Sequence, residues 1–196
     1  MSETIGEANF HHHHHAVQFY EEEQFLVERV AQFVATGRRE GEGCVVIATA
    51  EHKAAFAEEL RALEIDPDGI LFLDARTTLD KFLHHGMPHA HRFRQVIGGV
   101  LQNASEAGGR VRAYGEMVDL LWRDGEPDAA IRLEELWNDL GRRSSFRLFC
   151  GYSSAHFGDP RSATVLHRIC SAHSHVLSSP QDVLGAFLLK AHQIGR

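Results

Sequence analysis

The chain has 196 residues and a formal net charge of −7, from 20 basic and 27 acidic side chains. This length suits one domain with a substantial core, and the acidic balance argues against nucleic-acid binding because no basic stripe offsets phosphate repulsion. No apolar run reaches the roughly 18 residues of a membrane helix and no signal peptide is evident, so we expect a cytoplasmic protein. Cys44, Cys150 and Cys170 are widely separated and are expected to be reduced thiols.

The chain begins with a polar, histidine-rich segment. We expect residues 1–14 to be a disordered tail and residues 15–196 to form one domain. The run from His11 to His15 fits either a natural tract or the remnant of an expression tag. His15 to Tyr20 then predicts a strand, and apolar residues at helical spacing predict a helix that ends at Gly37.

Strand and helix signals alternate along the rest of the chain. The run CVVIA at 44–48 and the run ILFLDA at 70–75 are typical of buried parallel strands, and a helix is predicted after each one. Further strands are predicted at 111–114 and 146–152, and further helices at 93–107, at 130–140, at about 161–174 and at 181–193. The alternation predicts a single doubly wound α/β domain with a mostly parallel central sheet of five strands.

The stretch from Val111 to Leu140 is the most informative. A short strand ends at Gly115, and Glu116 follows at the carboxyl edge, where parallel sheets usually bind ligands. Glu116 fits a pocket carboxylate and equally an acid favoured by the helix dipole. Asp74 ends another strand and fits a helix cap as well as a pocket residue. These two carboxylates leave a residual hydrolase open as an alternative.

A phosphate-binding loop is expected between the strand at 44–48 and its helix. The segment ATAEHKAAF at 48–56 lacks the glycines that wrap a phosphate, and no Ser or Thr follows Lys53 to hold magnesium. His52 fits a ligand contact or an exposed residue of the first turn. Because the chain also lacks a nucleophile elbow and a Ser-His-Asp order, we expect that it is not an enzyme.

Two groups of histidines and cysteines suggest metal binding, although no cofactor is certain. Cys170, His173 and His175 lie in the segment CSAHSH, where Cys170 and His173 fit ligands of a soft metal or a haem, or ordinary core residues. The histidines at 84, 85, 89 and 91 fit a zinc site together with the N-terminal tract, or a solvated surface turn. Cys150 fits a small core residue or a pocket thiol.

The chain resembles the MEDS family, the methanogen/methylotroph sensory domain, from about His15 to Val176. The resemblance rests on the segments HAVQFYEEEQFL, VVIATAEHKAAF, LDARTTLDKF, GEMVDLLW, AAIRLEELWN, FRLFCGY and ICSAHSHV in this order. It implies a fold similar to RecA-like and KaiC-like ATPases without a functional phosphate-binding loop. It also implies a sensory role, with small hydrocarbon derivatives as ligands and histidine kinases or transcription regulators as partners.

Matching positions transfer the family's site to this chain. They are His15, Gln18, Tyr20, Thr49, His52, Asp74, Gly115, Glu116, Cys150 and Tyr152, with Cys170 and His173 in the last motif. Tyr114, at the end of its predicted strand, is a further candidate ligand contact. The sequence thus predicts a stand-alone sensor that holds a small organic molecule in an apolar crevice. The alternative is a metal or haem sensor that uses Cys170, His173 and additional histidines. A homodimer is the expected assembly.

Overall fold

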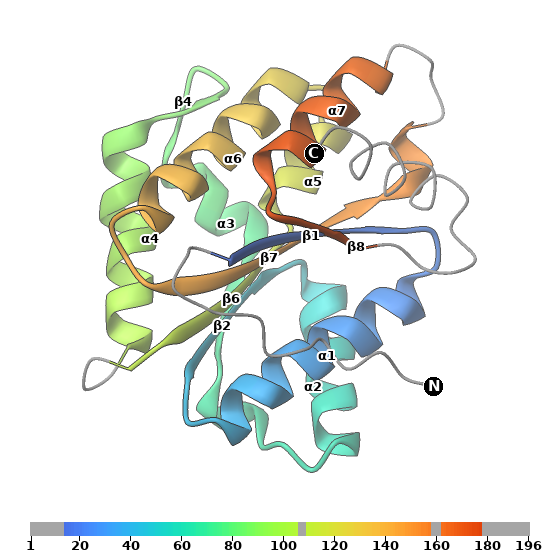
Figure 1. Cartoon of the computed structure of the whole chain (residues 1–196), viewed down its shortest axis with the longest axis vertical. Coiled ribbons are helices and arrows are strands. Elements are labelled where there is room, and N and C mark those ends of the chain that lie inside the picture. Colours follow the sequence, from blue (N-terminus) through green and yellow to red (C-terminus); the bar gives the residue numbers. More distant parts are fainter. Residues whose placement is uncertain (1–13, 106–108, 158–161, 178–196) are drawn as a thin grey trace.

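The computed structural model of the protein describes residues 14–105, 109–157 and 162–177 (Figure 1). Residues 1–13 of the predicted tail at 1–14 and the predicted helix at 181–193 lie outside the described residues.

A parallel sheet of six strands forms the centre of the molecule, in the order β3-β2-β6-β7-β1-β8 (Figure 1). Every pairing within this sheet is parallel. The strands are β1 (His14–Tyr20), β2 (Gly43–Ala48), β3 (Leu71–Asp74), β6 (Val111–Gly115), β7 (Phe146–Ser153) and β8 (His175–Leu177). The predicted fold class is confirmed. The sheet has one strand more than the five predicted. The additional strand is β8, which pairs with β1 over only three residues and is therefore too short to predict from the sequence.

Helices cover both faces of the sheet. One face carries α1 (Glu23–Arg39) and α2 (Ala50–Ala62), and the other carries α3 (Ala75–Asp80), α4 (Ala90–Ala104), α5 (Met117–Arg123), α6 (Pro127–Gly141) and α7 (Ser162–Ala172) (Figure 1). Two short 3-10 helices, η1 (Pro67–Gly69) and η3 (Ser154–Phe157), complete the helical elements of the described residues. No helix in the described ranges is long and apolar enough to cross a membrane.

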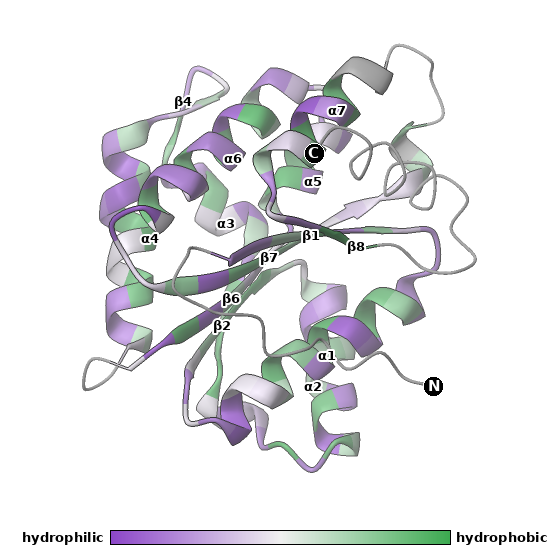
Figure 2. Cartoon of the chain, viewed as in Figure 1, coloured by the Kyte–Doolittle hydropathy of each residue, from purple (hydrophilic) through white to green (hydrophobic). Residues whose placement is uncertain are grey.

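The core has two layers, one on each face of the sheet. Successive residues of a strand point to opposite faces, so Val45 and Ile47 pack against the α3–α7 layer while Val46 and Ala48 pack against α1 and α2. The helices alternate hydrophobic and hydrophilic residues, as amphipathic helices on a sheet do (Figure 2). The strand β3 differs from its prediction as a buried strand, because it lies at the edge of the sheet and leaves Leu71 exposed.

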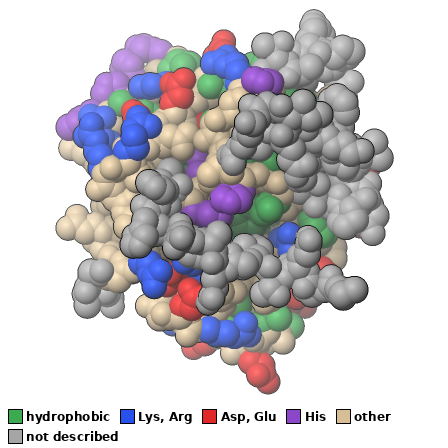
Figure 3. Space-filling view, viewed as in Figure 1, with side chains coloured by type: hydrophobic (Ala, Val, Ile, Leu, Met, Phe, Trp, Pro, Cys, Tyr) green, Lys and Arg blue, Asp and Glu red, His purple; other side chains and the backbone are tan. Residues whose placement is uncertain are grey.

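The histidine-rich segment after α3 forms a small hairpin, β4 (Leu83–His84) and β5 (Met87–Pro88). The turn places His85 and Gly86 at positive φ. The histidines at 84, 85, 89 and 91 are all exposed, and histidine side chains gather at the corner of the molecule where β4 lies (Figure 3). The interpretation as a solvated surface turn therefore agrees with their placement.

The connections of the sheet create a switch point between β2 and β6. The chain leaves β2 for α2 on one face, and it leaves β6 for α5 and α6 on the other face. The two strands are neighbours, so the segments at their carboxyl ends diverge. Open α/β sheets bind ligands at such points.

Candidate functional site

Glu116 lies at this switch point and is almost fully buried. Its carboxylate accepts hydrogen bonds from the backbone N–H of Thr49, from His52 Nδ1 at 2.6 Å and from the Tyr114 hydroxyl at 3.3 Å. Thr49 is the N-cap of α2, and a helix N-terminus favours an anion. A carboxylate of the chain itself therefore lies at the N-terminus of α2 and accepts a backbone N–H there.

His52 pairs with Glu116 through one ring nitrogen and leaves the other ring nitrogen for a ligand. Burial alone would lower the pKa of His52, but the hydrogen bond and the charge of Glu116 outweigh burial, so the pKa is raised. Because Nδ1 faces a carboxylate, it carries a proton. The other ring nitrogen, Nε2, has no hydrogen-bond partner among the described residues, and the side chain is 12% exposed. This nitrogen can therefore meet a ligand.

Two further buried groups surround this pair. Asp119 on α5 accepts a hydrogen bond from the Ser153 backbone N–H at 3.0 Å, and burial raises its pKa to about 6. The Tyr20 ring lies edge-on to the His52 ring, with centroids 6.3 Å apart. Burial, and then the charges of Asp119 and Glu116, raise the pKa of Tyr20, so its hydroxyl stays protonated. We call Tyr20, His52, Tyr114, Glu116 and Asp119 the edge cluster.

Tyr114 reaches the edge cluster because Gly151 on the neighbouring strand leaves it room. A Cβ atom at position 151 would lie 2.7 Å from the Tyr114 hydroxyl oxygen. Burial raises the pKa of Tyr114 well above its usual value, which keeps the hydroxyl as a donor to Glu116. Gln18 is also fully buried: its Nε2 donates to the Phe19 carbonyl at 2.7 Å, and its Oε1 has no hydrogen-bond partner among the described residues.

Asp74, the other carboxylate singled out in the sequence, is engaged elsewhere. It is the N-cap of α3 and accepts a hydrogen bond from the Thr77 backbone N–H at 2.8 Å, which lowers its pKa. It ends β3, which is separated from β6 by β2, so two strand spacings of about 5 Å each lie between the strands that carry Asp74 and Glu116. Asp74 therefore caps α3, whereas Glu116 bonds to Thr49, His52 and Tyr114.

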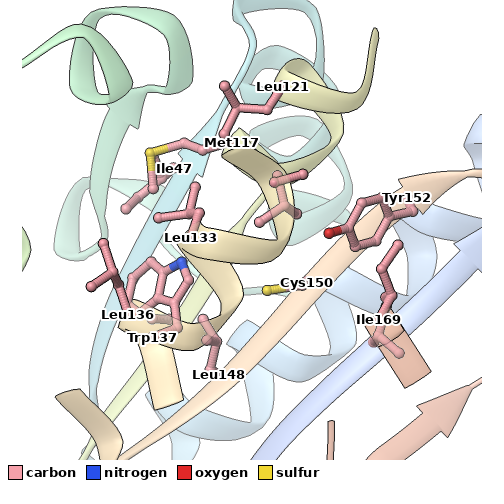
Figure 4. Packing of buried hydrophobic residues seen from close by; sticks show 14 of the residues in the cluster. Ile47, Met117, Leu121, Leu133, Leu136, Trp137, Leu148, Cys150, Tyr152 and Ile169 are labelled. Atoms are coloured by element: carbon pink, nitrogen blue, oxygen red, sulfur yellow. The ribbon is translucent and has the colours of Figure 1, made fainter. Parts of the chain in front are cut away.

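A second polar group lies between the sheet and α6. One ligand atom from each of His15, Glu134, Cys150 and His173 lies within 4.8 Å of the others. These four residues, which we call the inner cluster, are at most 3% exposed. They come from β1, α6, β7 and the segment after α7. Cys150 and its neighbour on the same face of β7, Tyr152, lie beside α6 in the hydrophobic core (Figure 4).

Glu134 connects the members of the inner cluster. Its Oε2 lies 3.3 Å from His15 Nε2, 3.5 Å from His173 Nε2 and 3.9 Å from Cys150 Sγ. Its Oε1 accepts a hydrogen bond from the Tyr152 hydroxyl at 2.8 Å. Burial would raise the pKa of Glu134, but His173, His15 and Tyr152 outweigh burial and lower it. The cluster therefore stabilises a carboxylate in the interior.

The structure thus gathers some of the predicted site residues into two clusters and leaves others, such as Asp74, outside both. His15, Cys150 and His173 meet in the inner cluster, whereas Cys170 and His175 are not members of it. Cys170 lies in the apolar core, where burial raises its pKa to about 11. The ring of His175 stacks on the ring of His14, with centroids 4.3 Å apart.

Sequence reasoning missed Glu134 and Asp119. Each carried a signal, because each is a charged residue within an otherwise apolar pattern. Glu134 falls on the inward stripe of α6, four residues after Ala130 and three before Trp137, and Asp119 interrupts the run MVDLLW. An acid at such a position is either paired or functional.

The arrangement of strands and helices defines a doubly wound α/β domain. A sequence model of the MEDS family, described as the methanogen/methylotroph, DcmR sensory domain, matches residues 14–174. The chain therefore belongs to the MEDS family of sensory domains, and the resemblance seen in the sequence is confirmed. Family membership supports a role in sensory signalling. No curated protein matches the chain in sequence.

Proposed function

We propose that the protein senses a small organic molecule at the edge cluster and passes the signal to a histidine kinase or a transcription regulator. The observation that carries this proposal is the pairing of Glu116 with His52 at the switch point of the sheet. Polar groups held at such a point by a rigid sheet are typical of ligand sites. The sensory character of the family supports the same conclusion.

The chemistry of the edge cluster limits the class of ligand. Glu116 already supplies an anion to the N-terminus of α2, so a phosphate or a carboxylate would meet a negative charge there. His52 Nε2 offers one hydrogen bond, and the ring of Tyr20 next to His52 offers apolar contact. A hydrocarbon derivative with a single hydroxyl, carbonyl or amine group satisfies these conditions.

The elements that begin at this site provide a route for the signal. The first turns of α2 and α5 meet at Glu116, which bonds to Thr49 at the start of α2 and precedes Met117 at the start of α5. A ligand that binds one arrangement of these helices more tightly shifts the population toward that arrangement, by no more than the difference in affinity. A kinase or regulator that contacts either helix would detect the shift, whether the sensor acts as a monomer or as the expected homodimer.

The experiment is a thermal-shift screen of short alcohols, ketones, amines and alkanes, with MgATP included. We expect one organic class to raise the melting temperature of the wild-type protein and to lose this effect in Glu116→Gln. The matched control is Asp74→Asn, which changes a carboxylate outside the edge cluster and should retain the response. A response that survives in Glu116→Gln, or one produced by MgATP, contradicts the proposal.

A further inference from the structure

The spacing of the inner cluster is close to that of a tetrahedral metal site. Zinc binds nitrogen, oxygen and sulfur ligands at about 2.0–2.3 Å, which places neighbouring ligand atoms about 3.3–3.8 Å apart. Four of the six distances in the inner cluster are 3.3, 3.3, 3.5 and 3.9 Å, and the other two pairs lie within 4.8 Å. A zinc ion between these atoms would therefore draw the more distant pairs closer by about 1 Å at most.

Hydrogen bonds outside the cluster orient both imidazoles. His15 Nδ1 lies 3.0 Å from Asn138 Oδ1, and the Asn138 amide is oriented because its Nδ2 donates to the Ala172 carbonyl at 2.8 Å. His173 Nδ1 lies 2.6 Å from the Ile169 carbonyl oxygen. Both acceptors are oxygens, so each Nδ1 donates a hydrogen bond and each ring turns its Nε2 into the cluster. With a metal bound, each Nε2 would give its lone pair to the ion.

The carboxylate is oriented in the same way. The Tyr152 hydroxyl donates to Glu134 Oε1, which leaves Oε2 facing the two histidines and Cys150. Partners of this kind fix the geometry of metal ligands in proteins.

The charges of the cluster balance a divalent cation. A thiolate and a carboxylate carry two negative charges, and two neutral imidazoles carry none, so one zinc ion makes the buried group neutral. Without a metal, a proton on one histidine must balance Glu134, and Cys150 stays a thiol because burial raises its pKa well above the usual value. A buried imidazolium–carboxylate pair is therefore the competing arrangement.

We propose that His15, Glu134, Cys150 and His173 bind one zinc ion through Nε2, Oε2, Sγ and Nε2. Four protein ligands close the coordination sphere, so the ion would tie β1, α6, β7 and the segment after α7 together. A haem does not fit this cluster, because its own nitrogens fill the equatorial positions that Glu134 and Cys150 would take. The zinc site is independent of the ligand at the edge cluster.

Cobalt(II) is the probe, because it replaces zinc and reports its ligands in its spectrum. The full chain, with His11, His12 and His13 changed to alanine, is produced under reducing conditions in zinc-depleted medium with cobalt(II). We expect a thiolate-to-cobalt charge-transfer band, intense visible bands of tetrahedral cobalt, and loss of both when zinc is added. Proton spectra should also show two exchangeable, paramagnetically shifted signals from the two Nδ1–H groups.

Variants of the three cysteines identify the thiolate ligand. Cys150→Ser should lose the charge-transfer band. Cys44 is buried on the other face of the sheet, so Cys44→Ser should keep the charge-transfer band. Cys170→Ser should also keep it, which separates this site from the one expected from the sequence. Tyr152→Phe should keep the band and weaken zinc binding by about 10- to 100-fold, because the partner of Glu134 Oε1 is removed.

The imidazolium–carboxylate arrangement predicts wild-type protein without the charge-transfer band, and that result would overturn the proposal. A band that persists in Cys150→Ser, or one that disappears in Cys170→Ser, would overturn it as well. If Cys150→Ser does not fold, Tyr152→Phe decides, and an unchanged affinity for zinc counts against the site. None of these outcomes changes the result expected for Glu116→Gln in the thermal-shift screen. The zinc proposal and the ligand proposal can therefore fail separately.

Discussion

At the scale of single residues, Asp119 links the edge cluster to pH. Burial raises its pKa from 3.8 to about 6 in the folded protein, so the folded state favours the protonated form. The associated stability is fully present below pH 3.8 and is lost as the pH rises through about 6. At neutral pH the ionised carboxylate is therefore a cost to folding.

The first prediction is that Asp119→Asn stabilises the protein at pH 7.5. An asparagine cannot ionise and its Oδ1 can still accept the Ser153 backbone N–H, so the gain can reach about 3 kcal/mol for a shift of this size. Urea unfolding at several pH values measures it. We expect the variant to lose the part of the pH dependence that falls between pH 3.8 and about 6. Equal free energies of unfolding for the two proteins at pH 7.5 would show that the ionised Asp119 carboxylate does not destabilise the folded state.

Site residues that follow a strand were predictable from the sequence. Site residues within helices were harder to predict. Glu116 and His52 each follow a predicted strand, and a parallel sheet brings such positions together. Glu134 and Asp119 lie within helices, where one acid in an apolar stripe resembles many solvated acids. Their partners, such as Tyr152 and Ser153, are distant in sequence, and only the fold brings them within reach.

At the scale of elements, Asp74 provides a test of capping against ligand binding. Its carboxylate accepts the Thr77 backbone N–H at the start of α3. We predict that Asp74→Ala destabilises the protein by about 1 kcal/mol, whereas Asp74→Asn, which keeps an N-cap acceptor, has a much smaller effect. Chemical unfolding of both variants measures the difference. A loss in Asp74→Asn as large as that in Asp74→Ala would show that the charge, not the cap, is required.

The close packing between the neighbouring strands β6 and β7 gives a second prediction at this scale. Gly151→Ala would place a Cβ atom 2.7 Å from the Tyr114 hydroxyl, and the buried ring has little freedom to move. We expect a loss of about 1–3 kcal/mol from overpacking. Gly98→Ala is the control: it lies in α4 with no atom within 4 Å of its added Cβ, and it should stabilise the helix by about 0.5–1 kcal/mol. Similar unfolding midpoints for the two variants would contradict the packing argument.

Elements were predictable from the sequence where their apolar pattern was long. The patterns of α1, α2 and β2 gave their positions within a few residues, because each buries a regular apolar face. The strand β8 has only three residues, too few for a pattern to develop, and β4 and β5 have two each. The edge position of β3 follows from pairing with β2 alone, which local sequence does not specify.

At the scale of the whole molecule, the strand order decides where the chemistry lies. The neighbours β2 and β6 are separated by more than 60 residues in the chain, and the connections that follow them diverge to opposite faces. The sequence predicted a parallel α/β domain without a phosphate-binding loop. It could not show that Glu116 bonds to the N-terminus of α2, because that contact depends on the strand order.

We propose that this internal carboxylate excludes a nucleotide from the switch point and leaves His52 for an organic ligand. Backbone amide spectra of Thr49, His52 and Lys53, recorded by NMR during a titration with MgATP, test it most directly. We predict no saturable shift of these amides in the wild-type protein, because Glu116 already bonds to the Thr49 N–H. Saturable shifts of Thr49 and His52 with MgATP would contradict the account.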